Sequence, residues 1–88
     1  MKTKFTKGKW FTDKFKPFIV KDINNNQVAY CYTENNNIDE DVANAKLIAS
    51  APEMFEMLEK TFNWLAKTQG NSIILEDINQ LLTKITEL

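Results

Sequence analysis

Lysines and aromatic residues are concentrated at the start of the chain, where together they could bind a polyanion. Residues 1–21 hold seven lysines and a single acid, Asp13, whereas the remaining 67 residues hold four lysines and eleven acids. The local charges are therefore +6 and −7, although the whole 88-residue chain carries only −1. Lysine ammonium groups bind phosphates, and aromatic rings stack on exposed bases. The pattern predicts a partner-binding or nucleic-acid-binding segment with five candidate residues: Lys7, Lys9, Trp10, Lys14 and Lys16.

The same segment also fits two other interpretations. It fits an exposed edge strand whose aromatic residues complete a small core, and it fits a surface for an acidic protein. All eleven basic residues are lysine, so the chain lacks the arginine fork that reads guanine. The pI of 5.4 is also below that of a typical nucleic-acid-binding domain. Any nucleic-acid binding is therefore predicted to be non-specific.

Two groups of carboxylates form a second charged pattern. Residues 39–41 are all acidic, and Glu53, Glu56 and Glu59 recur at three-residue spacing. Such a track could imitate the phosphates of a nucleic acid in a basic groove of a host enzyme. An ordinary solvated helix face has the same pattern, and the sequence leaves both interpretations open.

The composition excludes several classes of catalytic site. The chain has no histidine and one cysteine, Cys31, so histidine-dependent triads and the usual zinc ligand sets are absent. The two glycines, Gly8 and Gly70, form no phosphate-binding loop. Cys31 is interpreted as a small core residue. We therefore expect a non-enzymatic protein with no catalytic residue, no metal site and no cofactor.

The hydropathy pattern favours a cytoplasmic protein that does not enter a membrane. No window approaches the ~18 consecutive apolar residues that a membrane span needs. The lysine-rich N-terminus lacks the apolar stretch of a secretory signal. One cysteine excludes an internal disulfide, which fits a reducing compartment.

The elements that must position these residues begin with a predicted β-hairpin. Two β-rich runs, residues 18–23 and 27–33, flank an asparagine cluster. Because asparagine tolerates positive φ, Asn24-Asn25 could form a two-residue turn that pairs Lys21 with Val28 and Ile19 with Tyr30. One face of the hairpin would then carry Phe18, Val20, Ala29 and Cys31, and the other Ile19, Ile23, Val28, Tyr30 and Tyr32.

Helices are predicted over residues 39–49, 51–67 and 72–87. Asp39 is the expected N-cap of the first helix, and Ser50-Ala51-Pro52-Glu53 fits a capping box that starts the second. The residues expected to face inward follow helical spacing: Val42, Ala45, Leu47 and Ile48; Met54, Phe55, Leu58, Phe62 and Leu65; Ile74, Ile78, Leu81, Leu82, Ile85 and Leu88.

These elements predict an α+β fold in which an N-terminal antiparallel hairpin of two or three strands packs on three α-helices. We expect one domain over residues 1–88, with a flexible basic arm at 1–8 and the hairpin region at 9–33. Met57 and Trp64 flank the inward stripe of the second helix. Exposure of these two side chains would indicate an interface anchor.

The stretch ANAKLIASAPEMFEML, residues 43–58, resembles a motif common in small bacteriophage and prophage proteins of unassigned function. The shared pattern is close to Ala-Asn-Ala-(Arg/Lys)-Leu-Ile-Ala-x-Ala-Pro-Glu-(Leu/Met)-x-x-x-Leu. An upstream pattern of the same family matches Val20, Asp22, Asn24, Val28 and Ala29, with Asn25 where glycine would stand. The resemblance implies a phage or prophage gene acting in the host cytoplasm, and carries no catalytic motif.

Small phage accessory proteins often bind host machinery, so the resemblance implies a host protein as partner. The expected function is a binding protein that inhibits or redirects a host defence component, as an anti-CRISPR does, or a replication component. The alternative is a nucleic-acid-binding accessory protein that uses the lysine-aromatic segment. A third hypothesis, a sponge for a cyclic-nucleotide defence signal, would need an oligomeric pocket. The sequence leaves open whether the chain forms a homo-oligomer.

Overall fold

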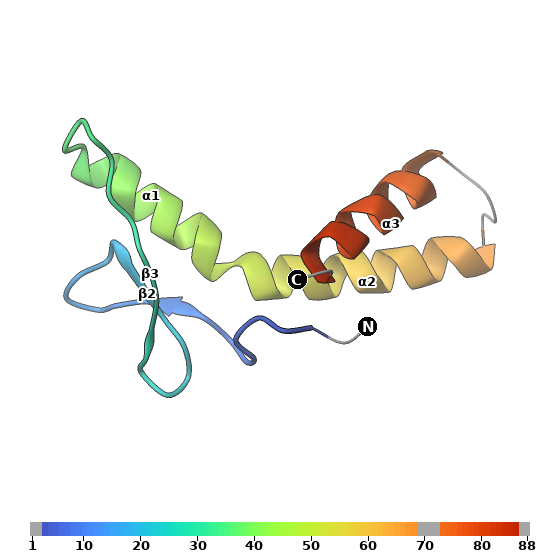
Figure 1. The fold of residues 1–88 in the computed structure, drawn as a ribbon, viewed down its shortest axis with the longest axis horizontal. Coiled ribbons are helices and arrows are strands. Elements are labelled where there is room, and N and C mark those ends of the chain that lie inside the picture. The colour runs from blue at the N-terminus through green and yellow to red at the C-terminus, as the bar shows by residue number, and fades with distance from the viewer. Residues whose placement is uncertain (1–2, 69–72, 87–88) are drawn as a thin grey trace. The chain divides into compact units, whose positions relative to one another are not determined.

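The computed structural model describes residues 3–68 and 73–86, which form a three-stranded antiparallel sheet followed by three helices (Figure 1). The α+β class is confirmed. The strands are β1 (Phe11–Thr12), β2 (Ile19–Lys21) and β3 (Gln27–Tyr30), and the helices are α1 (Ile38–Ala49), α2 (Ala51–Thr68) and α3 (Ile73–Thr86). The predicted helix limits at residues 72 and 87 lie outside the described residues, as do Leu88 and residues 1–2 of the predicted arm.

The described chain divides into two compact units. We call residues 6–53 the sheet unit, and residues 3–5 with the described residues from 54 onward the helical unit. Among the described residues, no helix is long and apolar enough to cross a membrane.

The hairpin turn between β2 and β3 is longer than predicted. Ile19 pairs with Tyr30 as expected, but a bulge after Val20 pairs Lys21 with Gln27 instead of Val28. The reason is the carboxylate of Asp22: its Oδ1 accepts hydrogen bonds from the amides of Asn24 and Asn26, both at 2.9 Å. An aspartate in this position favours a three-residue loop that ends in a residue of left-handed conformation.

Asn25 occupies that left-handed position, with φ of 65°. Its amide donates to the Asp22 carbonyl oxygen at 3.0 Å, and the Asp22 amide donates to the Asn26 carbonyl oxygen at 2.9 Å. Left-handed φ favours glycine, and asparagine tolerates it better than most other residues.

The core of the sheet unit lies between the sheet and α1, which packs against all three strands. Val20, Cys31 and Ala45 are its buried centre. Of the two predicted faces of the hairpin, the one with Val20 and Cys31 forms this core, and Phe18 and Ala29 of the same face join the cluster. Val28, predicted on the opposite face, also packs against the cluster, since a bulge shifts side chains from one face of a sheet to the other. Other contributors are Trp10, Ile48 and Ala49.

Helix α1 is rotated relative to the prediction. Its N-cap is Asn37, whose Oδ1 accepts from the Glu40 amide at 3.2 Å, so the prediction of Asp39 was wrong. Asp41 and Ala45 are the buried positions, whereas Leu47, predicted to face inward, is exposed. The face of α1 that packs on the sheet therefore includes Asp41 and Ala45.

The predicted capping box at the start of α2 is also wrong. The Ser50 hydroxyl donates to the Lys46 carbonyl oxygen at 3.0 Å instead of accepting from Glu53. Ser50 has nearly helical angles, φ −83° and ψ −7°, so it closes α1. Pro52 does lie in the first turn of α2, as predicted, where its missing N–H is tolerated.

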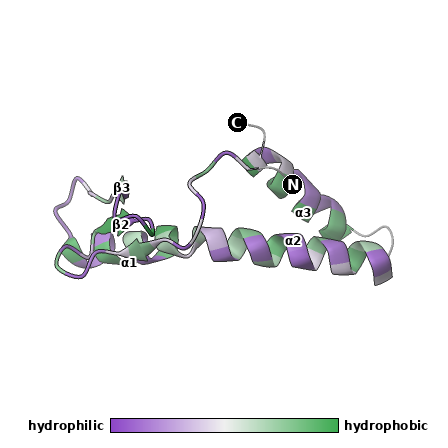
Figure 2. Cartoon of the chain, turned by 90° about the horizontal axis from the view of Figure 1, so that it is seen from below, coloured by the Kyte–Doolittle hydropathy of each residue, from purple (hydrophilic) through white to green (hydrophobic). Residues whose placement is uncertain are grey.

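The helical unit contains the amphipathic helices α2 and α3. Figure 2 shows hydrophobic and hydrophilic bands alternating along α2. Phe55 is buried on α2 and meets the ring of Phe5 edge to face, with centroids 5.2 Å apart. Leu82 is fully buried on α3. Three residues predicted to face inward are exposed because the buried faces are narrower than predicted: Met54, Ile74 and Leu81.

Candidate functional site

The predicted lysine-aromatic segment divides into exposed lysines and a packed tryptophan. Lys7, Lys9, Lys14 and Lys16 are exposed. Trp10 is half-buried and packs against the core of the sheet unit, and its indole N–H donates to the Thr6 carbonyl oxygen at 3.0 Å. Its ring therefore contributes to the core rather than standing beside the lysines.

A different aromatic residue, Phe15, is displayed among these lysines. It lies in the turn between β1 and β2, is 86% exposed, and has Lys14 Nζ 5.8 Å from its ring centroid. The turn is held by Asp13, whose Oδ2 accepts from the amides of Phe15 and Lys16 at 3.0 and 2.9 Å. A turn-forming aspartate followed by Lys-Phe-Lys was the sequence signal for this display.

Met57 and Trp64 are both exposed on α2, at 61% and 60%. Seven residues is about two helical turns, so the two side chains lie on the same face of the helix. This is the exposure that would suit an interface anchor.

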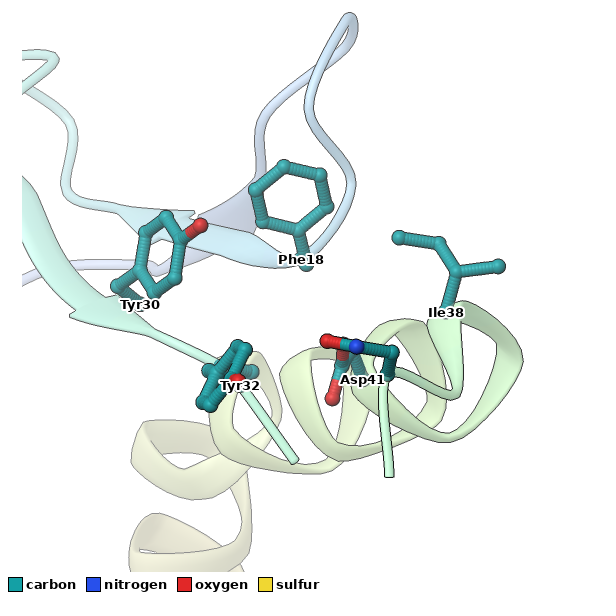
Figure 3. A pocket seen from close by; sticks show the side chains of 7 residues that line it. Phe18, Tyr30, Tyr32, Ile38 and Asp41 are labelled. Carbon is teal, nitrogen blue, oxygen red and sulfur yellow. The ribbon is translucent and has the colours of Figure 1, made fainter. Parts of the chain in front are cut away.

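A pocket in the sheet unit was not predicted from the sequence (Figure 3). It has a volume of about 230 Å³ and is open to solvent. Figure 3 shows one side of the pocket formed by Phe18, just before β2, by Tyr30 at the end of β3, and by Tyr32, just after β3. The other side comes from the first turn of α1, with Ile38 and Asp41. Cys31 and Asn36 complete its lining.

The rings of Phe18 and Tyr30 contact each other in one wall of the pocket. Phe18 and Tyr30 meet edge to face, with centroids 5.4 Å apart and an interplanar angle of 73°. Their backbones are linked because the Cys31 amide donates to the Phe18 carbonyl oxygen at 2.9 Å. Edge-to-face contact is a favoured arrangement of aromatic pairs, so the wall is defined before any ligand binds.

Asp41 is the carboxylate in the lining of the pocket. Its side chain comes from a buried position of α1, and the residue is only 6% exposed. Within the described part of the chain, Oδ1 of Asp41 has no hydrogen-bond partner. Buried carboxylate oxygens are normally paired, so this atom is available to a ligand that donates a hydrogen bond or carries positive charge.

Cys31 lies beside Asp41 and is unsuited to nucleophilic chemistry. Burial raises the pKa of the Cys31 thiol, and the negative charge of Asp41 raises this pKa further. The thiolate is the reactive form of cysteine, and it is disfavoured here. Among the described residues, no group of three histidine, cysteine or acidic side chains is arranged to hold a metal ion.

A second hollow of about 380 Å³ adjoins the pocket and shares Tyr30, Cys31 and Tyr32 with it. Leu47 lies on its border. Four large side chains around the two hollows are between 55% and 64% exposed, and we call them the tyrosine face: Tyr30, Tyr32, Ile38 and Leu47. The Tyr-Cys-Tyr alternation and an acid four residues before Ala45 were the sequence signals for this site.

Comparisons with known proteins identify one family. The family model described as Salmonella phage P22 protein Y8K6 matches residues 1–85 of the chain. No curated protein and no solved structure matches the chain.

Proposed function

The chain belongs to the family of Salmonella phage P22 protein Y8K6, and from this membership we propose that this small phage protein binds a host protein and thereby inhibits or redirects it. The proposed partner is a component of host defence or replication, in the host cytoplasm. The binding requires no catalysis by the phage protein. The observation that supports this proposal is the tyrosine face.

The tyrosine face has the composition of a protein interface. Tyrosine is enriched at such interfaces because its ring buries a large area while few rotatable bonds are immobilised. Tyr30 and Tyr32 are carried by β3 and the residue stretch directly after it, and Ile38 and Leu47 by α1. Because these elements share one core, the four side chains are presented by a folded scaffold, which reduces the entropy lost on binding.

Photo-crosslinking from the tyrosine face tests this proposal. A photoreactive phenylalanine analogue replaces Tyr32, the protein is produced in the host, and the crosslinked protein is identified and then purified. We expect a one-to-one complex with that protein, which Tyr30→Ser with Tyr32→Ser weakens at least about tenfold, since buried tyrosines are typical hot spots. The matched control, Trp64→Ser, removes an equally exposed aromatic residue of α2 and should leave the affinity unchanged.

Three results would contradict the proposal. A Tyr30→Ser, Tyr32→Ser protein that binds as tightly as the wild type would remove the tyrosine face from the interface. Loss of binding by Trp64→Ser alone would place the interface on Met57 and Trp64 instead. A crosslink only to a second copy of the chain would indicate a homo-oligomer rather than a host complex.

A second candidate function is binding of single-stranded nucleic acid by the β1–β2 turn. The observation that favours it is the display of Phe15 between the exposed Lys14 and Lys16. We expect a gel shift of a single-stranded oligonucleotide that weakens with added salt and is lost in Lys14→Glu with Lys16→Glu. The absence of any shift at low salt would dispose of this candidate.

A further inference from the structure

We infer that the pocket beside Asp41 binds one organic cation, and that in the host complex this cation is the end of a lysine or arginine side chain. The second part of the inference rests on the function proposed above. The first part rests on the pocket alone.

The buried carboxylate of Asp41 points to a positively charged ligand. Asn37 already caps α1, and Asp39 and Glu40 already place exposed acids in its first turn. The next inward positions of the helix carry apolar residues, Ala45 and Ile48. An aspartate at this site is therefore not needed for capping, and it leaves Oδ1 without a hydrogen bond. A bound ammonium or guanidinium group would supply both the donor and the opposite charge.

The aromatic walls favour the same ligand. A cation near the face of a phenylalanine or tyrosine ring is attracted by the negative charge of the π system. Phe18, Tyr30 and Tyr32 all line the pocket with Asp41. Aromatic rings around a single carboxylate are the combination that holds organic cations while shielding their charge from water.

The size and surroundings of the pocket argue against drug-sized and phosphate-bearing ligands. Its volume of about 230 Å³ is below the roughly 300–1,000 Å³ of pockets that enclose drug-sized ligands, so it suits the end of a side chain. Asp39 and Glu40 are exposed in the same helical turn as Asp41. Their negative charge repels phosphates, which argues against a cyclic nucleotide here.

The test is a nuclear magnetic resonance titration of the whole protein with n-butylammonium as the probe and n-butanol as its neutral counterpart. We expect saturable shifts of the Tyr32, Ile38 and Asp41 amides with n-butylammonium and none that saturate with n-butanol. Asp41→Asn should weaken n-butylammonium binding at least about tenfold, because it removes a charge-assisted hydrogen bond. The matched control, Asp39→Asn, removes an exposed charge from the same turn and should change binding less than about threefold.

A second variant separates binding from folding. Asp41→Leu fills the same inward position with an apolar side chain, so it should raise the urea midpoint of unfolding while n-butylammonium binding is lost. Two results together would show that Asp41 is a structural residue and would overturn the inference. In the first, Asp41→Leu unfolds the sheet unit. In the second, Asp41→Asn still binds n-butylammonium like the wild type. Non-saturable shifts with the wild type would overturn it as well.

The source of the cation is identified by measuring how tightly the same variants bind the host protein. If Asp41→Asn weakens the complex and Asp39→Asn does not, the cation belongs to the partner. If n-butylammonium binds but the complex is indifferent to Asp41→Asn, the assignment to the partner is wrong and the pocket serves a free organic cation. If n-butylammonium does not bind, the cation site fails while the complex at the tyrosine face still stands.

Discussion

Asp13 Oδ1 lies 2.9 Å from Lys21 Nζ. This ion pair joins the β1–β2 turn to the end of β2. Both side chains are largely withdrawn from solvent, at 18% and 22% exposure. Lys21 is one of the seven lysines of residues 1–21. It therefore helps to hold β1 and β2 together. The other oxygen of Asp13 binds the backbone of the turn, so one carboxylate organises both the turn and the ion pair.

Replacing Asp13 by asparagine should lower stability at neutral pH but not in acid. Lys21 and the amide of Lys16 lower the pKa of Asp13 below its usual value. A lowered carboxyl pKa contributes stability above the unfolded value of about 3.9, and this contribution is lost as the pH falls through the folded pKa. Urea unfolding midpoints of wild type and Asp13→Asn should differ near pH 7 and converge near pH 2. A difference that persists in acid would assign the effect to packing.

Removing the Asp22 carboxylate should destabilise the β2–β3 turn. The residue is 6% exposed, and its Oδ1 accepts two amide hydrogen bonds. Asp22→Ala should lower the free energy of unfolding by about 1–3 kcal/mol, because two part-buried hydrogen bonds from backbone amides to a charged acceptor are lost. Asp22→Asn keeps an acceptor oxygen and should recover part of the loss. Urea titration measures both, and equal effects of the two variants would disprove this role.

Alanine at positions 24 and 25 should have unequal effects. Asn25 has a φ of 65°, which costs a residue with a Cβ atom about 1–2 kcal/mol unless it can interact locally, as asparagine does. Asn25→Ala should therefore lower the unfolding free energy by about 1 kcal/mol, and Asn24→Ala by less than about 0.5 kcal/mol. Asn25→Gly should be tolerated, in agreement with the glycine of the family pattern. A destabilised Asn25→Gly would contradict this explanation.

Ser50→Ala should change stability little. Since the hydroxyl donates to the Lys46 carbonyl oxygen in place of capping α2, the variant loses only an exposed local hydrogen bond. We expect a change in unfolding free energy within about 0.5 kcal/mol, below the ~1 kcal/mol of a lost N-cap. Thermal or urea unfolding decides between the two arrangements, and a loss near the larger figure would restore the capping box.

The stability of the sheet unit should fall in alkaline solution because of Cys31. Burial and the charge of Asp41 raise the pKa of its thiol, so the folded chain holds this proton more tightly than the unfolded chain. Stability is then retained below the unfolded thiol pKa of about 8.5 and declines as the pH rises above it. Compared with Cys31→Ala, the wild type should lose more stability between about pH 8 and pH 10. Parallel pH profiles would show that Cys31 does not titrate differently on folding.

The elements of the fold could be predicted, but the buried side could be predicted for only some of them. Strand β2, the pairing of Ile19 with Tyr30 and the core face around Val20 follow from alternating apolar residues. Helical spacing located α1 and α2 to within a residue at each end. The errors at Leu47 and Val28 have different causes. At Val28, one extra residue in the β2–β3 pairing changes which strand face is buried. At Leu47, the packing of α1 on the sheet decides which helix face is buried, and a residue pattern does not contain that information.

The candidate site was largely hidden for the same reason. The exposed lysines could be chosen from charge alone, since solvated lysines are the rule. Trp10 could not be distinguished from Phe15 by composition, because both are aromatic residues among lysines. The difference arises because Trp10 reaches the core and Phe15 sits in a turn held by Asp13.

The sequence by itself determined the α+β class, the order of the elements, the charge division and the phage resemblance, because periodicity, turn residues and motifs act over short stretches of chain. Only the tertiary structure decided that Tyr30, Tyr32 and Asp41 share one pocket. Asp41 reads as an ordinary helix-start acid until α1 is placed on the sheet. Packing then withdraws its carboxylate from water beside Cys31, in a pocket that Phe18, Tyr30 and Tyr32 also line.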